Sequence, residues 1–236
     1  MNHTGFFKEA KASCERINLI LPKYIEQKEL LTLELERLVV RKEFAIGGKT
    51  IHRGYYCPSP IYDIIVGGCA RGRLAKRPGQ SEITYVYGMD AANNVVFADS
   101  FWGGKEYVFH KGDTVLSIVF RENFLQLPVV QVSECSYQNG ELRSYTLFDA
   151  DGHNVTAFWR EEYTYGKDGL LFADVQRYAI APQISDDGLM MRQRYHFEHD
   201  ESGYLSSFLL ETYSSKDLTV PSSMEGPYQV KQKRKV

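Results

Sequence analysis

The chain has 236 residues, of which 43% are hydrophobic and 25% charged, as is ordinary for a globular protein with a sizeable core. Its formal net charge of −2 excludes the strongly positive field that proteins use to hold nucleic acid or an anionic membrane surface. Aromatic residues make up 13% of the chain, with 16 Tyr among them, and tyrosine suits half-exposed strands because its ring packs while its hydroxyl stays hydrated. We therefore predict a single domain, residues 1–236, that is rich in β structure.

The cysteines and the N-terminus predict the compartment. Cys14, Cys57, Cys69 and Cys135 are widely spaced with no Cys-x-x-Cys pair, which argues against a zinc site or a redox dithiol and is typical of reduced thiols. Residues 1–11 lack the apolar core of about 7–15 residues that a signal peptide needs. No run approaches the ~18 apolar residues of a membrane span. We expect a cytoplasmic protein with no cofactor and no membrane or nucleic-acid partner.

A helical pattern opens the chain. Apolar residues recur at steps of three and four over Phe6–Leu21, which is typical of one face of an amphipathic helix. Thr4 is a suitable N-cap, and Pro22 ends this helix or begins the next one. Residues 23–42 permit a helix or a strand, and their Glu, Leu and Lys content favours a helix. We predict a helical N-terminal part over residues 4–42.

The next segment is irregular. Phe44–Ile51 has the pattern of a hairpin around a Gly-Gly turn, and Ile61–Val66 is a strand candidate. Two prolines within residues 55–60 mark the loop between them. Cys57, Cys69, His52 and Arg71 gather in the same part of the sequence. A thiolate nucleophile needs a base and a neighbouring cation, so an enzyme with its site around Cys57–Arg77 is an open alternative.

From Ile83 onward, alternation with a period of two dominates. Tyr85–Asp90 and Tyr163–Asp168 both read Tyr-x-Tyr-Gly-x-Asp, and looser copies end in Asx-Gly or Ser-Gly pairs. Such pairs are typical of tight hairpin turns, whose central residues need positive φ. The pattern predicts a β-hairpin meander over residues 43–213, either a twisted sheet or an open barrel. With the helical N-terminus packed on this sheet, the predicted fold class is α+β.

The recurring Tyr-x-Tyr and Asp-Gly-Leu wording of residues 137–213 resembles the tyrosine–aspartate (YD, Rhs-type) repeats and related bacterial β-meander repeat proteins. With residues 85–113 included, the resemblance covers about two thirds of the chain, although the turn spacing is irregular and the chain is much shorter than an Rhs shell. Small bacterial proteins of this kind often accompany polymorphic toxins as neutralising partners. The resemblance therefore implies binding of a protein rather than catalysis.

The C-terminal segment, residues 214–236, changes in composition. It is rich in Ser and Pro and ends in the basic cluster Lys231–Lys235. Such a composition predicts a partly disordered basic tail.

Strand tyrosines and arginines are the candidate binding residues. A row of aromatic rings on an open sheet could bind a protein, a peptide or a sugar, and strand arginines could form a charged binding surface. Two structural alternatives stay open, because the rings could instead pack against the N-terminal helices and the arginines could pair with glutamates across strands. The candidates are Arg71, Arg73, Arg160, Arg177, Arg192, Tyr163, Tyr165 and Tyr195.

Other titratable groups carry weaker signals. His196 and His199 are three positions apart, so in a strand they point to opposite faces and do not make a metal site. The pair Glu161-Glu162 likewise points apart and does not make a catalytic carboxylate dyad. We predict no catalytic residue and no metal. The expected function is a non-enzymatic bacterial binding protein with a protein partner, in its sharpest form the immunity-type partner of a toxin.

Overall fold

The computed structural model describes residues 3–47, 52–65, 71–76, 78–79, 82–101, 103–121, 129–152, 154–167, 169–179, 189–215 and 217–230, and the structural statements below refer to these residues. Two consecutive helices open the chain, α1 (His3–Glu26) and α2 (Lys28–Leu38), separated only by Gln27. α1 continues through Pro22 and ends four residues later. The interpretation of residues 23–42 as helical is confirmed up to Leu38, and Arg41 already begins the first strand.

Thirteen strands form one antiparallel sheet that is not closed. From β3 to β13 each strand pairs with the next in sequence, and β1 and β2 follow β3 at one edge, so the predicted meander is confirmed. The strands are β1 (Arg41–Ile46), β2 (Arg73–Ala75), β3 (Ile83–Met89), β4 (Val95–Ser100), β5 (Gly104–Lys111), β6 (Thr114–Arg121), β7 (Val129–Gln138), β8 (Glu141–Ala150), β9 (Val155–Gly166), β10 (Gly169–Ala179), β11 (Leu189–His199), β12 (Leu205–Tyr213) and β13 (Pro221–Gln229).

The Asx-Gly turns set the register of the meander. Asn139 and Gly140 have φ of 53° and 79°, and they connect the directly opposed residues Gln138 and Glu141. Positive φ at both central residues matches the right-handed twist of the strands on either side. The Asn139-Gly140 pair therefore determines the turn of the β7–β8 hairpin.

Two predicted elements in the irregular segment differ from the structure. The strand candidate Ile61–Val66 is wrong, because Pro60–Ile65 forms the short helix α3, preceded by the 3-10 turn η1 (Gly54–Tyr56). A short apolar run does not distinguish strand from helix, and a proline at the first helical position favours the helix. The predicted hairpin Phe44–Ile51 lies partly outside the described residues. Its first arm, β1, pairs instead with β3 and β2.

The C-terminal segment also contains a strand. Pro221–Gln229, within the region where the sequence predicts partial disorder, forms β13 and pairs with β12 along the sheet edge. All nine of its residues are exposed, so no apolar alternation marks this strand in the sequence. Lys231–Lys235 lies outside the described residues.

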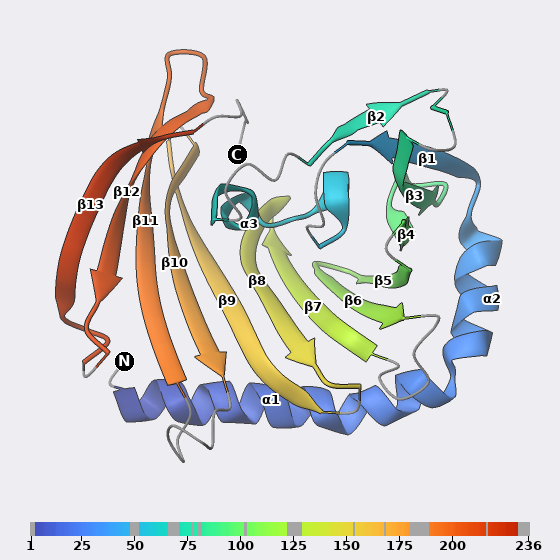
Figure 1. The fold of residues 1–236 in the computed structure, drawn as a ribbon, viewed down its shortest axis with the longest axis horizontal. Coiled ribbons are helices and arrows are strands. Elements are labelled where there is room, and N and C mark those ends of the chain that lie inside the picture. Colours follow the sequence, from blue (N-terminus) through green and yellow to red (C-terminus); the bar gives the residue numbers. More distant parts are fainter. Residues whose placement is uncertain are drawn as a thin grey trace.

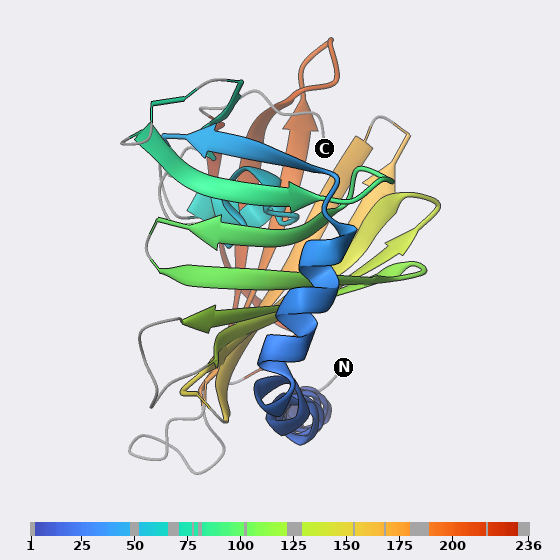
Figure 2. The same ribbon diagram turned by 90° about the vertical axis from the view of Figure 1, so that its right-hand side faces the viewer.

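The curved sheet has two buried faces with different coverings. On the outer face, Phe6, Ala10 and Ile17 of α1 share a hydrophobic core with strand residues that include Phe148 and Phe158. On the inner face, Ile61 of α3 shares a core with the rings of both Tyr-x-Tyr copies. α3 lies within the curve of the sheet, while α1 crosses one end of the strands and α2 stands against the first strands (Figures 1 and 2). In the described part of the chain, no helix has the length and apolarity to cross a membrane.

Candidate functional site

Three candidate tyrosines and Arg177 lie on the inner face. Tyr163 and Tyr195 expose only 5% and 3% of their surface, and Tyr165 packs partly buried against the same core. The guanidinium of Arg177 stacks on Trp159, with 3.9 Å between its central carbon and the ring centroid. These tyrosines therefore belong to the hydrophobic core of the inner face. It shares its core with α3, whereas the alternative in the sequence placed it against the N-terminal helices.

The other candidates from the irregular segment have different surroundings. Arg71 donates to main-chain carbonyls, at 3.1 Å to Tyr55 and 2.8 Å to Ser59, and also to the carbonyl of Cys57. Its guanidinium therefore holds the main chain of residues 52–65 in place. Arg73 is exposed on the three-residue edge strand β2. The geometry gives Arg71 a structural task and leaves Arg73 at the edge of the sheet.

The residues of the enzyme alternative face the core. Cys57 exposes 2% of its surface and His52 exposes 6%. The Nδ1 atom of His52 lies 3.1 Å from the hydroxyl of Tyr145 on β8. Burial lowers the pKa of His52 to about 4, so its imidazole is neutral at pH 7. Cys69 lies outside the described residues.

A buried ion pair joins residues 52–65 to the sheet. Nε of Arg53 donates to Glu106 on β5 at 2.9 Å, and Nη2 lies 3.4 Å from the hydroxyl of Ser133. Burial opposes the charged form of Glu106, but the positive charges of His52, which is protonated only in acid, and of Arg53 outweigh it and hold the pKa of Glu106 below its ordinary value. Because His52 is neutral at pH 7, Arg53 is the cation that neutralises this carboxylate. The pair is a buried lock between two parts of the chain.

A second buried carboxylate lies on β9. The hydroxyl of Ser59 lies 2.7 and 2.8 Å from the two oxygens of Glu161, Nε1 of Trp159 donates to it at 2.6 Å, and Tyr163 donates its hydroxyl. Burial raises the pKa of Glu161 to about 7, although these three donors act in the opposite direction. Glu161 is fully buried, so this perturbed acid is sealed inside the inner face.

The outer face carries a polar surface on β9–β12 that is mostly half-buried, with Glu162 exposed and Glu211 buried. In its first row, Gln176 of β10 lies directly opposite Arg160 of β9 on one side and Arg192 of β11 on the other. The neighbouring row lies two residues away on each strand, and in it Asp174 lies directly opposite Glu162 of β9 on one side and Arg194 of β11 on the other. We call this surface the outer polar strip, and its members are Arg160, Glu162, Asp174, Gln176, Arg192, Arg194 and Glu211.

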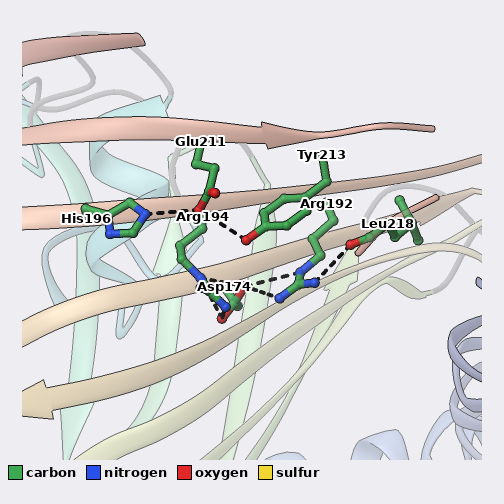
Figure 3. Close-up of polar contacts among 7 residues, drawn as sticks. All are labelled: Asp174, Arg192, Arg194, His196, Glu211, Tyr213 and Leu218. Carbon is green, nitrogen blue, oxygen red and sulfur yellow. Dashed lines mark hydrogen bonds and ion pairs between the residues drawn. The ribbon is translucent and has the colours of Figure 1, made fainter. Parts of the chain in front are cut away.

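Ion pairs and ring contacts order the arginines of the strip. Arg192 donates to Asp174 at 2.9 Å and to the carbonyl of Leu218 at 2.9 Å, and its guanidinium lies 4.2 Å from the ring centroid of Tyr213. Arg194 donates to the other oxygen of Asp174 at 2.9 Å. Figure 3 shows the two guanidinium groups converging on this one carboxylate. Both arginines are therefore held in place by contacts within the chain.

A groove of about 210 Å³ opens where the strip meets α1. Arg160 forms one wall and donates to Glu9 of α1 at 2.7 Å and to Glu162 at 2.5 Å. The side-chain amide of Gln176 also lines the groove and makes no hydrogen bond within the described part of the chain. The groove is lined by Phe6, Glu9, Arg160, Glu162, Gln176, Arg192 and Leu218.

The groove can recognise polar groups without favouring one sign of charge. Arg160 and Arg192 are balanced by Glu9 and Glu162, so the lining has no formal net charge. An arginine has five N–H donors; within the described part of the chain Arg160 uses two of them, and Arg192 uses three, the third being Nε, which donates to Asp174 at 3.2 Å. The remaining donors and the amide of Gln176 can bond both donors and acceptors of a polar group in the groove.

Strand alternation decides which sequence candidates meet. Of the eight candidates, Arg160 and Arg192 come together on the outer face, and the others do not join them. Asp174 and Gln176, which we did not predict, complete the strip. The signal was present, because residues two apart on one strand share a face, so Asp174 with Gln176 and Arg192 with Arg194 had to lie together. Which strands are neighbours in space was needed to align them.

His196 lies on the outer face with Nε2 3.1 Å from Glu211. Among the described residues, no three His, Cys, Asp or Glu side chains gather as metal ligands.

The chain matches no protein-family model and no curated protein. The case for a function therefore rests on the geometry of this chain.

Proposed function

We propose that the chain is a non-enzymatic binding protein whose ligand is another protein, and that the outer polar strip is the surface that contacts it. The observation that carries this proposal is the row Arg160–Gln176–Arg192, in which two ordered arginines flank an amide with unused hydrogen-bonding capacity. Arginines are enriched among the residues that contribute most to protein interfaces. Because these side chains are already ordered, binding costs less conformational entropy.

The charge pattern supports a specific partner. Across the strip, three arginines and three acidic side chains are distributed over four strands, and a complementary protein surface would match them one by one while a mismatched surface would bring like charges together. The perturbed acid and base of the inner face, Glu161 and His52, are buried and bonded to neighbours, out of reach of a substrate in this conformation. In the sharpest form of the proposal, the partner is a bacterial toxin and binding neutralises it.

Charge reversal on the strip tests the proposal. We expect wild-type protein, used as bait on an extract of its source cell, to capture one specific protein. Arg192→Glu should reduce the recovered amount at least tenfold, because the reversal adds a carboxylate beside Asp174, which already lies opposite Glu162. The matched control is Arg143→Glu, which makes the same charge change on β8 beside Tyr165 of the inner face. Thermal melting of both variants checks that the fold persists. Equal capture by Arg192→Glu and wild type would overturn the assignment of the strip.

The toxin form has its own test. The captured protein, expressed alone, should arrest growth of a bacterial host, and co-expression of the wild-type chain but not of Arg192→Glu should restore growth. A captured protein that is harmless when expressed alone would contradict the toxin form and leave the binding surface in place.

A further inference from the structure

Residues 52–65 occupy the concave side of the sheet without being one of its strands. They form a turn, η1 and α3, and Figure 1 shows this segment inside the curve. Two side chains of this segment, Arg53 and Ser59, make polar contacts with the strands. The hydroxyl of Tyr87 also accepts from the main-chain N–H of Tyr55 at 2.9 Å and donates to the carbonyl of Arg53 at 3.2 Å. The segment therefore lies against the inner face as a bound peptide would. We call the part of the inner face that it contacts, around Tyr87, Glu106 and Glu161, the trough.

The first contact point receives a guanidinium. Glu106 on β5 accepts from Arg53, and Ser133 on β7 lies beside the same guanidinium. The hydroxyls of Ser117 and Ser133 are 2.7 Å apart, and Ser117 also bonds Glu106. The sheet alone thus supplies an ordered acceptor group from three neighbouring strands.

The second contact point receives a hydroxyl. Glu161 accepts from Ser59, and its other donors, Trp159 and Tyr163, come from the same strand as Glu161 itself. The carboxylate is therefore positioned by the sheet whether or not Ser59 is present.

These two acceptors are unusual for a face whose only task is to form a core. Glu106 exposes 4% of its surface and Glu161 exposes none. A buried ion pair is often no more stabilising than well-packed apolar side chains of the same volume, so a core needs neither carboxylate. A face that receives a peptide needs groups of this kind, because they select for the side chains of the peptide.

We propose that the inner face is a second binding site, for a peptide segment that carries an arginine and a nearby serine or threonine hydroxyl, and that residues 52–59 occupy it in cis. The cis segment supplies both groups from Arg53 and Ser59. This site lies on the face opposite the outer polar strip, so the proposal does not depend on the function assigned to that strip.

The cis occupant hides the site from an external peptide. A tethered segment competes at an effective concentration on the order of millimolar. The apparent affinity for an external peptide falls in proportion to the fraction of molecules in which the trough is open. Wild-type protein should therefore bind such a peptide weakly, while a variant with a weakened cis segment should bind it more tightly.

The test uses a peptide with the sequence of residues 52–60, under reducing conditions, titrated by fluorescence anisotropy. We expect the double variant Arg53→Asn, Ser59→Ala to bind it at least tenfold more tightly than wild type; Asn tolerates the positive φ of 61° found at Arg53. Adding Glu106→Gln and Glu161→Gln to the double variant should abolish that gain. Replacing the peptide's arginine by alanine should do the same. Equal binding by wild type and the double variant, or a gain that survives removal of both carboxylates, would overturn the proposal.

Hydrogen exchange of the wild-type protein decides the question if the double variant does not fold. The N–H groups of Tyr56 and Cys57 are bonded within the segment, to the carbonyls of Arg53 and Gly54. If the segment leaves the trough while the sheet stays intact, these amides exchange at least tenfold faster than the slowest amides of β8 and β9. Exchange of both sets at one rate would show that the segment is released only by global unfolding, and would overturn the proposal.

Discussion

The two faces of one sheet have the same alternating pattern and different fates. On the inner face, residues 52–65 cover the tyrosines and enclose two carboxylates, each of which is bonded to a side chain of this segment. On the outer face, α1 covers the apolar part of β9 and β10 but stops beside a polar row in which some arginine donors and the amide of Gln176 make no hydrogen bond to the described residues. A period of two in the sequence places a side chain on one face of the sheet, whereas the element that covers this face decides whether the side chain belongs to the core or to the surface.

Removing one partner of the buried pair should have the largest effect on stability. Glu106→Ala leaves Arg53 charged and buried without its carboxylate, which costs about 3–5 kcal/mol of unfolding free energy. Glu162→Ala removes a carboxylate that pairs with Arg160 on the open face and is 48% exposed, so the cost there is about 1 kcal/mol or less. Urea denaturation of both variants measures the contrast. Equal losses would mean that the inner face is not sealed.

The pH dependence of stability sharpens the description of the inner face. Burial raises the pKa of Glu161 to about 7, while an unfolded glutamate titrates near about 4.3. The folded state keeps a proton that the unfolded chain loses, so this group lowers the unfolding free energy as pH rises between these two values. Burial lowers the pKa of His52 to about 4, so His52 acts in the opposite direction, and its stabilisation is lost as pH falls from about 6.5 towards 4.

Each of these opposing contributions is on the order of 3 kcal/mol, and in the wild type they largely cancel. In Glu161→Gln the opposing contribution of Glu161 is removed, and only that of His52 remains. We therefore predict that the unfolding free energy of this variant rises steeply with pH between about 4.5 and 6.5. Urea denaturation at several pH values measures the slope. A Glu161→Gln profile parallel to that of the wild type would contradict the burial of Glu161.

The smallest expected effect concerns the hairpin that both faces share. Gly169 has φ of 127°, a conformation that side-chain-bearing residues rarely adopt, so Gly169→Val should lower the unfolding free energy by about 1–3 kcal/mol. Gly166 lies directly opposite, and a Cβ built there would meet Leu171 only at 3.8 Å. Gly166→Ala is therefore the matched control, with a change of about 1 kcal/mol or less. An unchanged melting temperature for Gly169→Val would contradict the positive φ at Gly169 in this turn.

Local signals in the sequence identified much of the fold. The steps of three and four over Phe6–Leu21 identified α1, and pairs such as Asn139-Gly140 identified the hairpins, because both patterns depend on neighbouring residues alone. Residues 60–65 were misread because an apolar run of that length fits a strand as well as a helix. β13 carries no alternation to find, since all of its residues are exposed.

The candidate site was harder to predict than the fold. Arg160 and Arg192 were identified as candidates, but Asp174 and Gln176 join them only because β9, β10 and β11 are neighbours in a fixed register. Covering was the second unknown. Whether Tyr163 is a binding residue or a core residue depends on residues 52–65, which lie about a hundred positions earlier in the chain.

Arginine labelling with phenylglyoxal, read by mass spectrometry with and without the captured partner, shows which face of the sheet the partner covers. We expect Arg192 and Arg194 to react in the free protein and to be protected in the complex. Arg53 should stay unreactive in both, because its side chain is only 6% exposed. Reaction of Arg192 and Arg194 at the same rate in the free protein and in the complex would contradict the claim that the outer face is the open, partner-binding side of the sheet.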